Sequence, residues 1–119
     1  MSKIVTHLDF LKCFAKSQTK KQQHLIIDWA LKKHIDTLSE ICLNILISNL
    51  KLPDISFKSL RSQKKVLRIL ARKDYTIRYK KQLLKRSSGF FKLFPKILDT
   101  ITHVIPELQS NHCSVLGSK

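Results

Sequence analysis

The sequence predicts an all-α fold, a small single domain of five or six short helices. Its 119 residues fit one domain with a modest core. Only 2 glycines and 3 prolines are present, too few for a chain of tight hairpins. Apolar residues make up 43% and recur at helical spacing along most of the chain. These observations favour packed helices over a β-sandwich, a barrel or a disordered basic tail.

Three helices are predicted in the N-terminal half, over 7–16, 20–33 and from Thr37 onward, with Ser17-Gln18-Thr19 as a break and cap. Thr37 to Glu40 has the form of a capping box, in which Thr37 caps and Glu40 reaches back. Asp28 is interpreted as a helix-face charge and Asp36 as a cap. The residues expected to face inward are Leu8, Leu11, Phe14 and Ala15, then Leu25, Ile26, Trp29 and Ala30, then Leu38, Ile41, Cys42, Ile45 and Leu46.

The C-terminal half predicts a turn at Pro53-Asp54 and helices over 56–73, 76–86 and an apolar segment, 90–105. Pro95 opens or kinks the last helix, and Pro106 ends it. We expect the helices over 20–33, from Thr37 and over 56–73 to form the core with segment 90–105. The inward residues of the fourth and fifth helices are Phe57, Leu60, Leu67, Leu70, Ala71, Leu83 and Leu84, with Lys64 snorkelling from the apolar side. The domain is expected to span 1–106, with a disordered polar tail over 107–119.

Positive charge is concentrated in the middle of the chain. The formal net charge is +15, and residues 51–96 hold 15 Lys and Arg against 2 Asp. Such a segment attracts polyanions, of which nucleic acid is the commonest and an anionic membrane surface the second. The candidate phosphate-binding residues are Lys58, Arg61, Lys64, Lys65, Arg68, Arg72, Lys73, Arg78, Lys80, Lys81, Lys85 and Arg86. Their pattern favours backbone contacts without sequence readout.

Other interpretations of the same surface stay open. Tyr75 and Tyr79 could stack on unpaired bases or simply cover a core edge. Base readout by the fourth and fifth helices is disfavoured because Gln63 and Gln82 are the only amide side chains there. Whether DNA or RNA, single or double strands, is bound is not decided by the sequence.

Segment 90–105 supports an alternative function. Its apolar side chains could insert into an anionic membrane interface, as part of a membrane-active minor capsid component, or could complete the core. The candidate membrane residues are Phe90, Phe91, Phe94, Ile97, Leu98 and Ile101. A third hypothesis is a module that binds an acidic capsid protein.

No enzymatic motif is present, and we expect neither a catalytic site nor a cofactor nor a metal. The three cysteines, Cys13, Cys42 and Cys113, are odd in number, lack metal-ligand spacing and indicate a reducing compartment. The N-terminus lacks a secretory pattern, and no stretch of about 18 uncharged apolar residues could span a membrane.

Three blocks of sequence, in order, resemble a family of small basic proteins. Residues 38–52 resemble the block hxEChxNxLxGNxxL, 60–71 resemble LRxxKKxLRxLA, and 80–95 resemble KKRxLLxxxGGFLxxLLP. These blocks are typical of proteins encoded by Maverick/Polinton-type DNA elements and adintoviruses. The resemblance covers roughly 8–105. One extra residue separates Glu40 from Cys42, and Ser88 replaces the first glycine of the Gly-Gly pair.

The family is in turn similar to the precursor of the adenovirus core peptide mu, or protein X. This resemblance implies a virion core protein that condenses packaged DNA, assembles in the host nucleus and stays in the particle. It also implies DNA contacts between Arg61 and Arg86, and a processing junction near Ser88-Gly89 that the serine puts in question.

Overall fold

The computed structural model describes residues 6–47, 52, 55 and 57–104, and the described part confirms the all-α prediction. Seven helices run through these residues, and no strand occurs among them: α2 (Leu8–Lys16), α3 (Lys20–Trp29), α4 (Lys32–Leu46), α5 (Phe57–Ser62), α6 (Lys64–Ala71), α7 (Ile77–Lys85) and α8 (Ser88–Val104). The predicted turn at Pro53-Asp54 and tail 107–119 lie outside the described residues.

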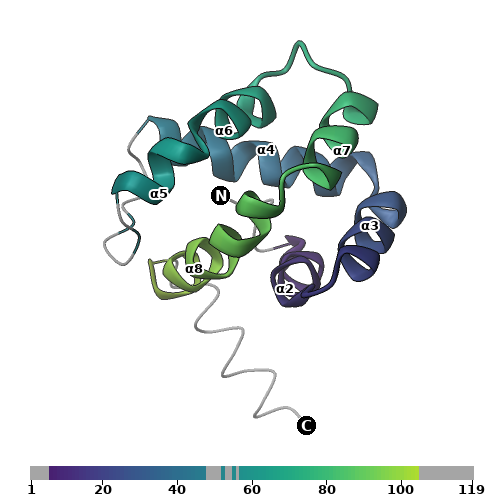
Figure 1. Ribbon diagram of the computed structural model, residues 1–119, viewed down its shortest axis with the longest axis horizontal. Coiled ribbons are helices and arrows are strands. Elements are labelled where there is room, and N and C mark those ends of the chain that lie inside the picture. The colour runs from purple at the N-terminus through teal and green to yellow at the C-terminus, as the bar shows by residue number, and fades with distance from the viewer. Residues whose placement is uncertain (1–5, 48–51, 53–54, 56, 105–119) are drawn as a thin grey trace, which may run out of the picture.

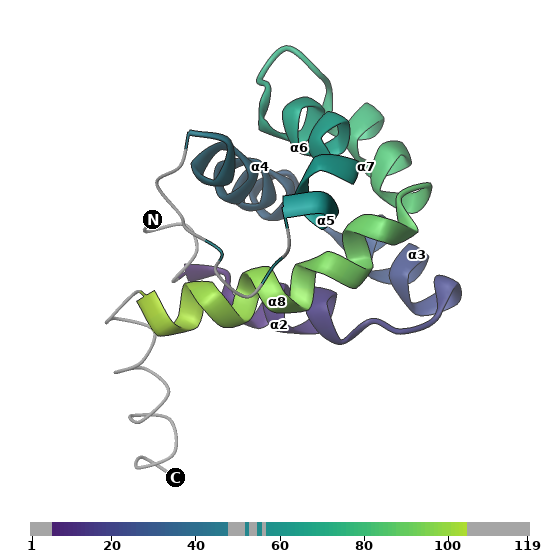
Figure 2. The ribbon, with the colours of Figure 1, turned by 60° about the vertical axis from the view of Figure 1, so that its left-hand side comes forward.

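Helices far apart in the sequence pack as pairs. Helix α4 packs against α6, α3 against α7 and α2 against α8. Figure 1 shows α4 crossing behind α6 and α7, and the turned view of Figure 2 shows α8 alongside α2. The core lies between these pairs, so every described helix except the short α5 has a partner more than 15 residues away along the chain.

The centre of the core is a group of phenylalanines contributed by α2 and α8. Phe14 lies 4.4 Å from Phe91, 4.9 Å from Phe94 and 6.2 Å from Phe90, measured between ring centroids, and the ring of Phe94 meets it edge to face. Such aromatic pairs are stabilising beyond the area they bury. The prediction had omitted the first helix from the core, but Leu11 and Phe14 are as buried as any residue in it.

Segment 90–105 completes the core over its described part. Phe90, Phe91, Phe94, Ile97, Leu98 and Ile101 are all buried. Pro95 lies inside α8 and is exposed, so it neither opens the helix nor ends it. No helix in the described part of the chain is long and apolar enough to cross a bilayer.

The predicted cap of α4 is wrong. Thr37 lies within the helix and is buried, and its hydroxyl donates to the Lys33 carbonyl, 2.8 Å away. The helix begins five residues earlier, where the Leu31 N–H donates to His34 Nδ1 at 3.0 Å. Asp36 is not a cap either, because it lies in the second turn and pairs with Lys32 at 2.9 Å.

The second predicted helix ends early. The helix expected over 20–33 stops at Trp29, because Ala30 turns into an extended conformation and α4 starts at Lys32. Trp29, predicted to face inward, is 80% exposed, and Leu25 is 51% exposed. The inner face of α3 is instead formed by Ile27, with Ile26 packed beside it. The Thr19 cap is confirmed, and it forms a capping box with Gln22.

The helix predicted over 56–73 is broken at Gln63 into α5 and α6. The break turns Lys64 outward, so it is exposed and does not snorkel. Leu67 and Leu70 are buried as predicted, as is Leu84 on α7. Gln63 lies against Gly89 at the start of α8: a β-carbon at that glycine would come within 3.1 Å of Gln63 Cδ.

Candidate nucleic-acid interface

Helix α6 carries the clearest functional surface. Leu67 and Leu70 face the core, and Lys64, Lys65 and Arg68 are exposed on the opposite side. Because residues i, i+1 and i+4 lie on one side of a helix, the three cations share one face. No acidic residue occurs in α6. The helix therefore presents an unmixed positive face to solvent.

Arg72, another of the candidate phosphate-binding residues, directly follows α6. Its guanidinium donates twice to the Asp74 carboxylate, at 2.9 and 2.6 Å. This hydrogen-bonded pair lowers the pKa of Asp74 and raises that of Arg72. Arg72 also lies over the ring of Tyr75, 5.6 Å from its centroid. A phosphate would compete with Asp74 for this side chain, so Arg72 is a weaker contact than its neighbours on α6.

Most of the predicted phosphate-binding residues are exposed, and they come from α5, α6, α7 and the residues that directly follow α6 and α7. Arg61 belongs to α5, so the break at Gln63 separates it from the cations of α6, with which it was predicted to share one helix. The exposed set is Lys58, Arg61, Lys64, Lys65, Arg68, Arg72, Lys73, Arg78 and Arg86.

Lys81 and Lys85 lie at the interface between α7 and α3 and are half-buried. Lys85 forms an ion pair with Asp28, and Lys81 Nζ lies 3.4 Å from the Asp28 carbonyl oxygen. The backbone carbonyl oxygen of Lys85 is itself 3.3 Å from His24 Nε2. Contact with Lys85 is the main cause that lowers the pKa of Asp28. These two lysines hold α7 on α3 and are less available for a polyanion.

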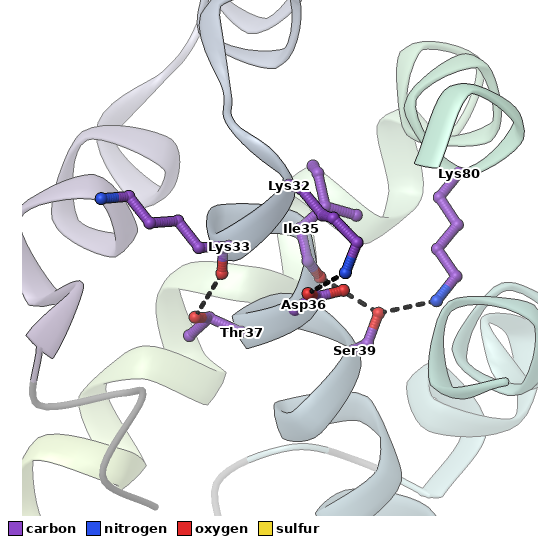
Figure 3. Close-up of polar contacts among 7 residues, drawn as sticks. All are labelled: Lys32, Lys33, Ile35, Asp36, Thr37, Ser39 and Lys80. Carbon is purple, nitrogen blue, oxygen red and sulfur yellow. Dashed lines mark hydrogen bonds and ion pairs between the residues drawn. The ribbon is translucent and has the colours of Figure 1, made fainter. Parts of the chain in front are cut away.

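Lys80 was predicted as a phosphate-binding residue, but the structure buries it. Only 3% of the residue is exposed, and its ammonium donates to the Ser39 hydroxyl of α4 at 2.9 Å (Figure 3). Ser39 in turn donates to the Ile35 carbonyl at 3.0 Å. Lys80 therefore joins α7 to α4 and does not face a ligand on the outer surface.

Burial lowers the pKa of the Lys80 ammonium, and the nearby Asp36 carboxylate opposes that effect. The unfolded chain keeps its proton up to the ordinary value of 10.5. Between the folded and unfolded pKa values the unfolded state binds more protons, so the contribution of Lys80 to stability rises with pH through that window. At neutral pH the buried charge is a cost.

We expect Lys80→Met to leave the domain equally stable at pH 7 or to stabilise it by about 1 kcal/mol, because Ser39 keeps its bond to Ile35. The advantage of methionine should shrink as pH rises toward 10.5 and the wild-type lysine loses its charge. Urea unfolding at several pH values measures both effects. Lys64→Met, at an exposed position, is the control and should show no such pH dependence. A clear loss of stability at pH 7 that is constant with pH would contradict this account.

A groove of about 670 Å³ lies between α4 and the connection from α6 to α7. Lys32 and Lys73 line it together with Asp36 and Glu40, and Lys80 lies at its α7 side. Because both signs of charge occur within it, the groove has no marked preference for an anion. No group of three or more His, Cys, Asp or Glu residues able to hold a metal occurs in the described ranges.

The two tyrosines that could stack on bases or cover a core edge stack on each other. The rings of Tyr75 and Tyr79 are 5.0 Å apart and nearly parallel. Gln63, one of the two amides considered for base readout, lies against the start of α8, whereas Gln82 is exposed. The exposed surface is thus richer in charge than in groups that read bases.

The fold and this surface together define a small all-α domain in which α6 presents an exposed face of three cations. Comparison with protein-family models, curated proteins and solved structures gave no match to the chain. The sequence reasoning missed a second surface feature, the exposed Trp29 on α3. The sequence signal for it was ambiguous, since five of the six residues from Leu25 to Ala30 are apolar and two different stripes fit helical spacing.

Proposed function

We propose that the protein binds nucleic acid without sequence preference, through the basic side formed by α5, α6 and the exposed cations of α7. The observation that carries the proposal is the α6 face, where Lys64, Lys65 and Arg68 are exposed together on a helix without acidic residues. Ordinary solvated helix faces mix both signs. Lysine and arginine bind phosphates by neutralising them and releasing condensed counterions, which requires no base contact.

We also propose, on the resemblance of residues 8–105 to the proteins of Maverick/Polinton-type elements, that the nucleic acid is DNA packaged in a virus-like particle. The excess of positive charge suits a protein that must neutralise a polyanion at high concentration. In that role the protein would act stoichiometrically as a core component and would catalyse nothing.

The test is the salt dependence of binding to random-sequence duplex DNA, followed by fluorescence anisotropy of labelled DNA. If five of the exposed cations contact phosphates, log K should fall with log salt at a slope of about −4.5. Duplexes of unrelated sequence should bind within about tenfold of one another, less than the specificity ratios of sequence readers. A flat salt dependence, or a strong preference for one sequence, would refute the proposal.

A further inference from the structure

The corner where α3 meets α4 exposes large apolar side chains. Leu25, Trp29 and Leu31, which we call the apolar corner, are 51%, 80% and 54% exposed. Leu25 and Trp29 are one helical turn apart on the same face of α3, and Leu31 lies two residues further on in the turn. Isolated exposed apolar residues are ordinary, but a cluster that includes a tryptophan marks an interaction surface.

A buried residue and hydrogen bonds fix the backbone at the apolar corner. Ala30 is buried, and its N–H donates to the Ile27 carbonyl at 3.2 Å. The Leu31 N–H is fixed by His34 Nδ1, and the His34 ring stacks on Phe10 with 4.4 Å between centroids. The exposure of Trp29 therefore follows from the ordered backbone on either side of it.

Exposed lysines flank the apolar corner along the chain. Lys21 lies one turn before Leu25 on the same face of α3, and Lys32 and Lys33 begin α4. Lys32 pairs with Asp36, whereas no acidic partner is present for Lys21 or Lys33 in the described part of the chain. The acidic residue nearest in sequence, Asp28, is paired with Lys85. In Figure 3 the Lys33 side chain points away from the pair formed by Lys32 and Asp36. A binding partner complementary to this surface carries negative charge and has an apolar layer below that charge.

We propose that the apolar corner docks on the surface of an anionic membrane. Tryptophan is enriched at the headgroup level of bilayers, leucine gains from entering the acyl boundary, and lysines are attracted to anionic lipids. Two of the three apolar side chains are aliphatic and provide no face for base stacking, which favours lipid over unpaired nucleic acid as the occupant. The contact is peripheral and reversible, and it leaves the fold intact.

This docking differs from membrane insertion by segment 90–105. That segment is core, so its insertion would require α8 to leave the phenylalanine group around Phe14. The reactivity of the Cys42 thiol distinguishes docking by the apolar corner from insertion of segment 90–105. Burial raises the pKa of this thiol to about 12, so the thiol is unreactive while the core is closed. Docking by the apolar corner leaves Cys42 protected. Release of α8 opens the buried cluster to which Cys42 and the α8 side chains both belong, and it should therefore make the thiol accessible to alkylation.

Trp29 is the sole tryptophan and is therefore a direct probe of the site. The experiment adds phosphatidylcholine vesicles containing one quarter phosphatidylserine to the full chain and records tryptophan emission and iodoacetamide labelling of Cys42. We expect a shift of emission to shorter wavelength that depends on phosphatidylserine and weakens with salt. Cys42 should stay unlabelled throughout.

The double variant Leu25→Gln/Leu31→Gln keeps the probe and should weaken vesicle binding by about tenfold or more. Leu43→Gln/Ile47→Gln is the matched control. It changes two exposed apolar residues toward the other end of α4, roughly 20 Å away at 1.5 Å per residue, and should bind vesicles like the wild type. Both variants change only exposed side chains, and circular dichroism verifies that each is folded.

Three results would overturn the proposal. The first is an unchanged emission spectrum with vesicles of every composition. The second is vesicle binding that survives the Leu25/Leu31 change or that makes Cys42 reactive, which would assign the contact to another surface or to α8. The third is quenching of Trp29 by single-stranded oligonucleotides without any vesicle effect, which would identify the corner as a base-stacking site. Duplex binding through α6 is measured separately, so either function can fail alone.

Discussion

Phe14→Ala is expected to destabilise the domain by about 3–5 kcal/mol, the range found when a buried phenylalanine is truncated. Phe14 is 1% exposed and contacts three phenylalanines of α8, so its removal leaves a cavity where α2 and α8 meet. Domains of this size are stable by only about 5–15 kcal/mol in total. The midpoint of urea unfolding should therefore fall steeply, with the slope m unchanged.

Phe14→Leu is the second variant in this experiment, and it keeps the test measurable if the alanine variant does not fold. It retains most of the apolar volume and should cost less than the alanine change but more than about 1 kcal/mol, since the ring contacts are lost. Phe10→Leu is the control: Phe10 is half-buried and lies at the edge of the group, 5.9 Å from Phe14. An equal effect at both positions would show that the group is not centred on Phe14.

The triple variant Lys64→Gln/Lys65→Gln/Arg68→Gln should lose most of the salt-dependent DNA affinity contributed by α6. If each cation contacts one phosphate, the slope of log K against log salt becomes shallower by about 0.9 for each, or about 2.7 in all. Between 50 and 200 mM salt the wild type would then lose about 40-fold more affinity than the variant. Anisotropy titrations with one random-sequence duplex at several salt concentrations measure the change.

The matched control for this variant removes three exposed lysines from α2 and α8, Lys16→Gln/Lys92→Gln/Lys96→Gln. It lowers the net charge by the same amount, so it separates contact at α6 from the general field of the protein. The control should weaken binding only modestly. If both triple variants lose the same slope, the α6 face is not a distinct interface.

Most of the basic face of α6 could be predicted from sequence because it depends on spacing within eight residues. The spacing places Lys65 and Arg68 opposite the inward-facing Leu67 and Leu70. It assigns Lys64 to the apolar side, and there the prediction fails because the helix breaks at Gln63 and leaves Lys64 exposed. The burial of Lys80 could not be predicted in the same way. Its partner Ser39 is 41 residues away, and the packing of α7 on α4 brings them together.

Local patterns failed where two of them competed. The sequence from Thr37 to Glu40 fits a capping box, but the apolar spacing of α4 extends back to Ile35, which is fully buried. The true start depends on the ring of His34 accepting from Leu31, an arrangement without a common sequence signature. In α3, burial of Ile27 decided between two apolar stripes and left Trp29 outside, whereas Ala30, just after the helix, is buried as predicted. Tertiary packing decides which of the competing local patterns forms in each helix.

The pairing of α4 with α6, α3 with α7 and α2 with α8 is nested: the outermost pair joins the first described helix to the last. Loop-closure entropy favours the innermost pair first and the outermost last. On the ribosome, α2 emerges early, but its main partner, α8, is the last of the described helices to be synthesised. Phe14 therefore lacks its contacts with the α8 phenylalanines through the translation of more than 70 further residues, and any chain that stops before Ser88 never forms them.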